Sequence, residues 1–547
     1  MRVKKVLFFL LISNYIFAQW SVSNAERSAL ISIYNSTNGD FWSQTWDLEK
    51  DPQTWYGIRV KGGFVTEINL RGNALKGNFP TVISSFPALE KLDLSNNQLE
   101  GEVSSGISSL TNLIRLDISN NRFSGDPSLV LGSLSQLQEL SIGNNYFSVS
   151  DVDGLLRNFS NLQVLDLSNL GLTSVPKSIT KNKGLQVLNL SNNTISENFG
   201  LLSGFLFLTE INLSGNQLTA IPSELSSNLK VLDLSNNLFS KNYSATLSKL
   251  KNLEWLSLEN NQITEFPTEL SQLQKLIHLN FGRNKISGGT SALLSLPNLQ
   301  QVFLNNNQFS GEFPAELLQL KNLQMLALNS NQLSGNIPQN IPAITFIENN
   351  RFTENQISTF LKSQSLNLNS KNVDFVYSPQ RYDQEKTVSA HINASTSLTQ
   401  SISGENYTFT WFKNLDKNLN VHSQNYSINS VKQEDLDVYT CEAYLVKKFP
   451  FFMMELSFFR EPITLTETMG TDESQKNISI YPNPTSDFLN IKTENIKVKS
   501  STIYDLSGKQ IFSTQDSSID VGFLPSGVYV IVIKTENGEK TFKWIKR

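Results

Sequence analysis

Short runs of leucine alternating with polar residues recur along the first two thirds of the chain. In the stretch LEKLDLSNNQL, Leu92 and Leu94 flank the polar Asp93, and Asn97 closes the run. Such a two-residue period predicts a short strand with one buried side and one solvent-facing side. If each run supplies one strand and the strands stack in parallel, the leucines fill one continuous core.

An asparagine closes almost every run and gives the repeat its period. Successive markers are 21 to 25 residues apart, and Leu170 takes the place of the asparagine once. The marker asparagines are Asn73, Asn97, Asn121, Asn145, Asn193, Asn216, Asn237, Asn261, Asn284, Asn307 and Asn331. Twelve units reading L-x-x-L-x-L-x-x-N-x-L, or close to it, resemble the leucine-rich repeat family. The resemblance spans residues 65–353 and implies an α/β leucine-rich repeat solenoid, right-handed, of about 12 repeats plus caps.

The chain must turn sharply after each strand, which leaves backbone groups unpaired inside the coil. A buried asparagine amide can satisfy them because it carries both donors and an acceptor. In leucine-rich repeat proteins these asparagines stack into a ladder, so the resemblance implies the same structural role here. Leu170 cannot hydrogen-bond in this way, and we expect a local irregularity there.

A repeat array exposes its core at both ends and needs caps. Residues 20–64 contain a predicted helix with an apolar face and then three tryptophans: Ala29, Leu30, Ile33 and Tyr34, followed by Trp42, Trp46 and Trp55. This segment resembles the N-terminal cap of plant-type arrays but lacks that cap's cysteine pair. Several repeats also contain G-x-[I/F]-P, as at 311–314, which resembles the repeats of plant receptor ectodomains. Residues 354–381 are expected to form the C-terminal cap and linker.

The strand positions between the leucines point away from the core, toward the concave face of the solenoid. In the earlier repeats they are mostly short and polar, and they include an acidic column of Asp93, Asp117, Asp166 and Asp233. Strand positions one repeat apart do not by themselves build the compact oxygen cage that Ca²⁺ needs. We therefore expect a solvated face there rather than a cation site.

Large side chains replace the polar ones in the later repeats. They are Val231, Trp255, His278, Phe303, Met325 and Phe346. Apolar side chains gathered on an exposed face usually mark an interaction site, and tryptophan is a favoured interface anchor. We expect a ligand-binding patch on the C-terminal half of the concave face. The alternative is that these residues pack on one another, or against the following domain, and only cover the end of the array.

Beyond the array the period disappears, and short β-rich runs predict two all-β sandwich domains. The first, residues 382–466, contains Trp411 and a D-x-Y-x-C motif that ends at Cys441. These residues resemble the core tryptophan and the tyrosine-corner strand of an immunoglobulin-like domain. The partner cysteine is missing and we expect Leu398 to take its place, which would leave Cys441 as a buried, inert thiol.

The second β-rich segment, residues 478–547, opens with ISIYPNPTSDFLNI and ends with GVYVIVIKTENGEKTFKWIKR. Asn537-Gly538 is a strong hairpin turn between two β-rich runs. These motifs resemble the C-terminal sorting domain of type IX secretion substrates in Bacteroidetes. The resemblance implies recognition by the outer-membrane export machinery, then removal of the domain and release or surface attachment of the passenger. The polar linker 467–477 is the expected cleavage region.

Residues 1–19 are expected to be a secretory signal peptide. A basic start precedes an apolar run from Val6 to Ile12 and a small residue, Ala18. A membrane anchor is the alternative, but the run is well short of the roughly 20 residues that a spanning helix needs. No later segment is long and apolar enough to span a membrane, so we expect no transmembrane segment in the mature chain.

Composition narrows the functional classes. Charged residues make up 17% of the 547, the net charge is −4, and no basic block occurs, so nucleic acid is not an expected partner. Cys441 is the only cysteine, which leaves no internal disulfide. His278, His391 and His422 are scattered, and we find no zinc-protease motif, nucleophile elbow or phosphate loop. We expect no enzyme activity, no cofactor and no metal.

Together these features predict an exported protein that is secreted or attached to the cell surface. The leading interpretation is an adhesin or receptor-like module whose concave face binds a protein or glycan. One alternative is an accessory protein that holds a polymer for separate extracellular enzymes. A weaker one is a hydrolase with an unrecognised site. The fold resemblance names no ligand.

Overall fold

The computed structural model describes residues 21–223, 225–240, 244–364, 374–414, 416–450, 452–468, 478–493, 496–506, 508–536 and 538–547. The chain forms two compact units. The first comprises the chain up to Asp383 with Ser401–Phe409 and Glu442–Arg460, and the second comprises Gln384–Gln400, Thr410–Cys441 and Glu461–Arg547. The predicted signal peptide and most of the predicted linker 467–477 lie outside the described residues. Within the described part of the chain, no helix is long and apolar enough to cross a membrane.

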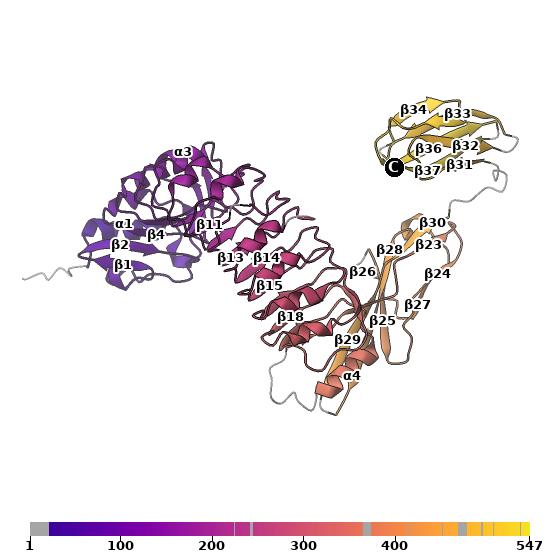
Figure 1. Ribbon diagram of the computed structural model, residues 1–547. Helices are drawn as coiled ribbons and strands as arrows, with labels where there is room; N and C mark the ends of the chain where they lie inside the picture. Colours follow the sequence, from indigo (N-terminus) through magenta and orange to yellow (C-terminus); the bar gives the residue numbers. More distant parts are fainter. Residues whose placement is uncertain are drawn as a thin grey trace, which may run out of the picture. The chain divides into compact units, whose positions relative to one another are not determined.

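One long sheet runs through the first unit, and its 15 strands follow the order of the chain (Figure 1). Neighbouring strands are parallel except for the hairpin that begins the sheet. The strands are β1 (Ile58–Lys61), β2 (Phe64–Asn69), β4 (Lys91–Asp93), β6 (Arg115–Asp117), β8 (Glu139–Ser141), β10 (Val164–Asp166), β11 (Val187–Asn189), β12 (Glu210–Asn212), β13 (Val231–Asp233), β14 (Trp255–Ser257), β15 (His278–Asn280), β16 (Gln301–Phe303), β18 (Met325–Ala327), β20 (Ile344–Phe346) and β21 (Asp374–Val376). We call the side of this sheet that carries the non-leucine positions the concave face.

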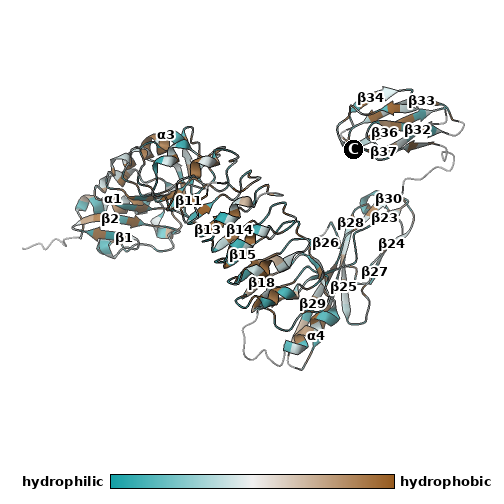
Figure 2. Ribbon diagram, in the orientation of Figure 1, coloured by the Kyte–Doolittle hydropathy of each residue, from teal (hydrophilic) through white to brown (hydrophobic). Residues whose placement is uncertain are grey.

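Equivalent leucines pair across neighbouring strands. Leu92 pairs with Leu116, and Leu232 pairs with Leu256, which in turn pairs with Leu279. All five are fully buried. Burying a leucine side chain stabilises a fold by about 2 kcal/mol, so the repeated column is the main support of the array. Figure 2 shows hydrophobic residues along the whole array rather than at one end.

The opposite wall of the array consists of short helical turns, most of them 3-10 helices. They are η3 (Thr81–Ser85), η4 (Ser105–Ser109), α2 (Ser128–Leu131), α3 (Val152–Leu156), η5 (Lys177–Lys181), η6 (Phe199–Leu202), η7 (Ala245–Lys249), η8 (Thr268–Gln272), η9 (Thr290–Ser295) and η10 (Ala315–Gln319). Two small parallel sheets also join neighbouring repeats: β3 (Lys76–Asn78), β5 (Gln98–Glu102), β7 (Arg122–Gly125) and β9 (Tyr146–Phe147); and β17 (Ser310–Glu312) with β19 (Gln332–Ser334). A repeat of about two dozen residues leaves room for little more than one turn of helix.

The N-terminal cap is a helix with an aromatic cluster. Helix α1 (Asn24–Ser36) begins at Ser23, whose hydroxyl accepts a hydrogen bond from the Glu26 backbone N–H at 3.2 Å. The buried Glu26 carboxylate in turn accepts the backbone N–H of Val65 at 3.1 Å, which ties the helix to β2. The turns η1 (Gly39–Phe41) and η2 (Pro52–Thr54) follow the helix. Tyr34 packs against the rings of Trp42 and Trp46, and Trp46 stacks on Trp55, with ring centroids 4.8–6.0 Å apart.

The C-terminal end of the array is closed by a helix and a strand. Helix α4 (Glu354–Gln364) follows the last repeat and buries Ile357 and Phe360. The Phe360 ring lies 4.7 Å from that of Phe375 in β21. The first unit also contains β22 (Gln380–Tyr382) and β29 (Met453–Arg460), which pair in parallel, and the part of β28 (Val438–Lys448) that pairs with β29.

The second unit begins with β-rich structure around Trp411. Its strands are β23 (Lys386–Ala390), β24 (Thr396–Thr399), the end of β25 (Tyr407–Lys413), β26 (Lys417–Asn418), β27 (Asn425–Ile428), the start of β28 and β30 (Ile463–Glu467), with the turn η11 (Gln433–Asp435). Trp411 is fully buried and its indole N–H donates to the Ser423 carbonyl at 3.0 Å. The Tyr439 hydroxyl donates to the Asp435 carbonyl at 2.7 Å, the hydrogen bond typical of a tyrosine corner. Leu398 and Cys441 are both fully buried.

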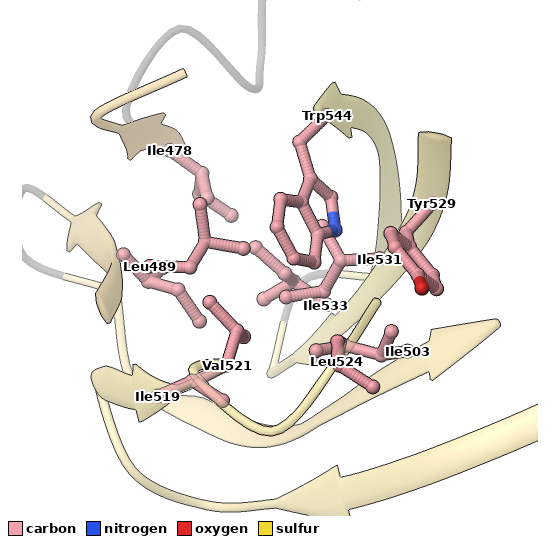
Figure 3. Close-up of a cluster of buried hydrophobic side chains, with 11 residues drawn as sticks. Ile478, Leu489, Ile503, Ile519, Val521, Leu524, Tyr529, Ile531, Ile533 and Trp544 are labelled. Carbon is pink, nitrogen blue, oxygen red and sulfur yellow. The ribbon is translucent and has the colours of Figure 1, made fainter. Parts of the chain in front are cut away.

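The last part of the second unit contains two small sheets around one core. One sheet has β31 (Ile478–Tyr481), β32 (Phe488–Thr493) and β35 (Ser518–Asp520), and the other has β34 (Gln510–Thr514), β33 (Val498–Tyr504), β36 (Gly527–Thr535) and β37 (Gly538–Lys546). Figure 3 shows Trp544 and aliphatic side chains such as Leu489 and Ile533 converging between the strands. Strand β36 pairs on both sides, as its apolar sequence predicts, and Thr535 pairs with Gly538 across the hairpin. Asn537 of the predicted turn lies outside the described residues.

Candidate ligand-binding surface on the concave face

The six residues of the predicted patch all lie at concave positions of the long sheet. Val231, Trp255 and His278 are neighbours in one column, which continues through Gln301 to Met325. A second column contains Asn280, Phe303, Ala327 and Phe346, in that order. Neighbouring strands are about 4.8 Å apart, so side chains in adjacent strands of a column touch. We call Val231, Trp255, His278, Phe303, Met325 and Phe346 the concave patch.

Every residue of the concave patch is half-buried, neither exposed nor inside the core. Trp255 and His278 are stacked, with ring centroids 4.8 Å apart and planes 13° from parallel. Phe303 continues the stack, with its centroid 5.1 Å from that of His278. The rings therefore bury part of one another, as expected if these residues only pack on one another. They also leave an aromatic surface on the concave face, as a ligand-binding patch requires.

Phe346 stands apart from this stack. It pairs with Ala327 on one side and with Val376 on the other, and both are smaller side chains. The small Ala327 side chain leaves a step in the surface between Phe303 and Phe346. The concave patch is therefore an aromatic stack of three rings with separate apolar residues beside it, rather than one uniform cluster.

His278 is held as a partly buried imidazole at the centre of the stack. Its Nδ1 lies 2.9 Å from Oε1 of Gln301, and its buried Nε2 has no hydrogen-bond partner among the described residues. Burial lowers the pKa of His278, against the opposing influence of the Gln301 hydrogen bond and the Asp233 charge. A lowered pKa favours the neutral ring, which suits stacking between two aromatic neighbours.

Charged and polar side chains border the stack. Lys230 pairs with Glu254 at 3.3 Å, and Arg283 pairs with Glu259 at 3.5 Å. The Asn280 amide also donates to Glu259 at 3.0 Å. Exposed ion pairs of this kind contribute little to stability. An apolar centre with a polar border is nevertheless the common arrangement of protein interfaces.

The acidic column of the earlier repeats is hydrogen-bonded within the array. Asp117 and Asp166 each accept the backbone N–H two residues ahead, from Ser119 and Ser168. Burial raises the pKa of both carboxyls, although these hydrogen bonds oppose the shift. Arg115, which the sequence did not single out, pairs with Asp93 at 3.3 Å and with Glu139 at 3.0 Å. No group of three or more His, Cys, Asp or Glu residues in the described chain could hold a metal ion.

The marker asparagines hydrogen-bond in one recurring pattern. Nδ2 of Asn97 donates to the carbonyls of Leu70, Leu94 and Ser95, and its Oδ1 accepts the backbone N–H groups of Asn73 and Leu75. The amides of Asn121, Asn145, Asn193, Asn216, Asn237, Asn261, Asn284, Asn307 and Asn331 each donate to three carbonyls and accept the N–H of an earlier repeat in the same way. The sheet stays in register past Leu170, whereas the small sheet β3–β5–β7–β9 ends one repeat before it.

Both ends of this ladder are closed by residues that the repeat pattern did not mark. Asn73 exchanges hydrogen bonds with the Gln44 backbone of the N-terminal cap. At the other end Asn350 continues the ladder, and the fully buried Gln380 follows it. Gln380 accepts the Phe352 N–H at 3.2 Å and donates to the Ile347 carbonyl at 3.0 Å. Gln380 does not stand at the spacing of the repeat, so the periodicity of the sequence could not identify it.

Family models match two parts of the chain. The family "Secretion system C-terminal sorting domain" matches residues 479–547. Leucine-rich repeat families match residues 207–263 and residues 88–110, 112–134 and 298–320. The chain is a leucine-rich repeat protein with a secretion sorting tail. The tail indicates type IX secretion and an extracellular or cell-surface location.

Curated relatives match part of this leucine-rich repeat protein. It is 28% identical to receptor-like protein 18 of Arabidopsis thaliana over 173 residues, which is 30% of this chain and 20% of that protein. It is 31% identical to keratocan of Mus musculus over 160 residues, 28% of this chain and 45% of that protein. A solved leucine-rich repeat protein of Leptospira interrogans is 32% identical, covering 53% of this chain and 75% of that one, with a TM-score of 0.45. The chain spans less than half the length of the two curated relatives.

Proposed function

We propose that this protein is an exported binding module, an adhesin or receptor-like protein, whose concave patch holds a protein or glycan ligand. The observation that carries the proposal is the stack of Trp255, His278 and Phe303 on a face whose other residues are mostly polar. Rings that are already packed on one another lose little side-chain freedom when a ligand covers them. Solvent-facing aromatic groups also supply the largest gain on burial.

The domain scheme forms part of the same proposal. A signal peptide 1–19 and a cap 20–64 precede the solenoid 65–353, and a C-terminal cap 354–381 follows it. Residues 382–466 form an immunoglobulin-like domain, supported by the buried Trp411 and the Tyr439 hydrogen bond. The sorting domain 478–547 is removed within 467–477 as the passenger is released or attached to a Bacteroidetes cell surface.

Paired alanine substitution tests the concave patch. The double variant Trp255→Ala with Phe303→Ala removes two of three stacked rings, and we expect ligand binding to weaken by about 100-fold, the usual cost of losing two interface anchors. Glu210→Ala, an exposed concave position two strands before Trp255, is the matched control. Purified chains would be compared on surface-protein extracts and on a glycan array. A folded double variant with undiminished binding would remove the proposal.

A second candidate function, holding a neutral polymer for separate degrading enzymes, is favoured by a different hollow. This hollow of about 480 Å³ is lined by Gln138, Gln163, Gln186 and Phe207, with Ser160 and Asn161 nearby. Phe207 is 63% exposed, and amide side chains beside an exposed ring suit a sugar surface. Co-sedimentation with insoluble polysaccharide should fall in Phe207→Ala and stay unchanged in the Trp255/Phe303 double variant if this candidate is right.

A further inference from the structure

A second hollow lies at the C-terminal end of the concave face, within the first unit. It has a volume of about 390 Å³, and its lining includes Phe375, Val376, Tyr377, Tyr444, Glu455 and Ser457. These residues come from two segments of the chain about 70 residues apart, so no local motif in the sequence marks them. The lining combines three aromatic rings with one carboxylate.

The strand pairing explains why these side chains meet. β21 is the last strand of the long sheet, and its Val376 pairs with Phe346 of the concave patch. In the hairpin β28–β29, Tyr444 pairs with Ser457 and Val446 pairs with Glu455. The intervening residues of that hairpin, such as Leu445 and Leu456, are buried. Tyr444, Glu455 and Ser457 therefore share its other face, and the Ser457 N–H donates to the Ser378 hydroxyl at 3.0 Å to join the two walls.

Glu455 is positioned by the two tyrosines. The Tyr444 hydroxyl hydrogen-bonds to the Glu455 carboxylate, and the Tyr377 hydroxyl accepts the Glu455 backbone N–H. Burial raises the pKa of both tyrosines, and the negative charge of Glu455 raises it further. The carboxylate thus stands within electrostatic reach of both hydroxyl groups, beside the rings rather than turned away from them.

Glu455 lies outside the ion pairs of the described residues. Lys448 is exposed on the same face of the hairpin, and the cations Lys447 and Arg460 of the opposite face pair with other carboxylates. Lys447 pairs with Glu354 at 2.5 Å, and Arg460 pairs with Asp383 at 3.2 Å. Asp374, exposed at the start of β21, adds a second negative charge at this end of the sheet.

We propose that this pocket binds the cationic group of a peptide ligand, the guanidinium of an arginine or the ammonium of a lysine. A cation is attracted to aromatic ring faces and to a carboxylate at once, and the two attractions reinforce each other where water is partly excluded. The proposal rests on the proposed function, since it assigns one basic residue of the ligand whose apolar part covers the concave patch. Because Val376 adjoins Phe346, one extended segment can reach both.

Small probes test the pocket without knowledge of the ligand. Nα-acetyl-arginine amide, Nα-acetyl-lysine amide and the uncharged Nα-acetyl-citrulline amide would be titrated into the full chain and followed by ligand-observed NMR. We expect the arginine or lysine probe to bind and the citrulline probe, which has the shape of arginine, to bind at least about fivefold more weakly. Equal binding of all three, or no binding of either cation, overturns the proposal.

Variants locate the binding and separate it from the concave patch. Glu455→Gln keeps the size of the side chain and should weaken the cationic probe about fivefold, whereas Glu265→Gln, an exposed carboxylate elsewhere in the array, should leave it unchanged. Tyr444→Phe keeps the ring but removes the hydroxyl that hydrogen-bonds to the Glu455 carboxylate. It should weaken binding of the cationic probe less than Glu455→Gln does. If a captured partner loses affinity in the Trp255/Phe303 double variant but not in Glu455→Gln, the pocket assignment fails while the binding function stands.

Discussion

The two halves of the concave face share one backbone and present different chemistry. In the earlier half Arg115 bridges Asp93 and Glu139, and neighbouring carboxylates are hydrogen-bonded to the array itself. In the later half the same strand positions hold stacked Trp255 and His278. The leucines beneath are equivalent and fully buried in both halves. The buried positions therefore build the array, and the positions between them differ in chemistry from one half to the other.

The strongest test of that separation removes equivalent leucines. Leu140→Ala and Leu279→Ala each empty a fully buried site in one half, and each should lower the free energy of unfolding by about 3 kcal/mol. Urea titration followed by both circular dichroism and fluorescence measures the loss, because repeat arrays can unfold in parts. A much larger cost at Leu279 would show that the aromatic stack above it supports the fold.

Removing a ladder asparagine in each half should cost somewhat less. Asn121→Ala and Asn261→Ala each remove an amide that donates to three carbonyls and accepts one N–H. We expect a loss of about 2 kcal/mol in either half, since buried backbone groups are left without partners. Gln217→Ala, at an exposed position beside the ladder, is the control for urea unfolding. Unequal losses would mean that the ladder asparagines stabilise one half of the array more than the other.

The smallest expected effect is a pH dependence of stability that comes from His278 in the later half of the concave face. The folded pKa of His278 lies below that of an unfolded histidine, so the unfolded chain binds the proton more readily. Stability is fully present above the unfolded pKa of about 6.5, and it falls as pH drops through that value toward the folded pKa. The difference in melting temperature between wild type and His278→Gln should therefore change over this window.

Two measurements make that pH effect specific. His391→Gln, at an exposed position outside the stack, is the matched control for the loss of a histidine. The His278 ring resonance in an NMR titration reports the proton directly. A melting difference that does not vary with pH would contradict the assignment of a neutral His278 to the stack.

The repeat was readable from the sequence because its period is strict. The alternation around Leu92 and the spacing of the asparagines place the strands of the long sheet from β2 to β18, and the sorting tail is carried by contiguous motifs. The stacking of Trp255 on His278 could not be read in this way, since it depends on the orientation of side chains on neighbouring strands. The hollow around Glu455 was equally hidden, because it needs β21 and the hairpin β28–β29 together.

The helical content of the array shows a further difference. The sequence predicted short helical turns along the outer wall of an α/β solenoid, and most of these turns are 3-10 turns such as η4 and η8. Short polar stretches such as Ser105–Ser109 contain serines that favour caps and tight turns over helix interiors. Periodicity located these segments correctly and did not determine how tightly they would wind.

The aromatic cap on α1 bears on where this protein can mature. Four rings close the first repeat where a cystine could have done so, and the chain's lone thiol is buried at Cys441. No oxidation step is then needed to complete the fold, and reductants such as dithiothreitol should leave its melting temperature unchanged. Folding before, during or after passage through an oxidising compartment would give the same molecule.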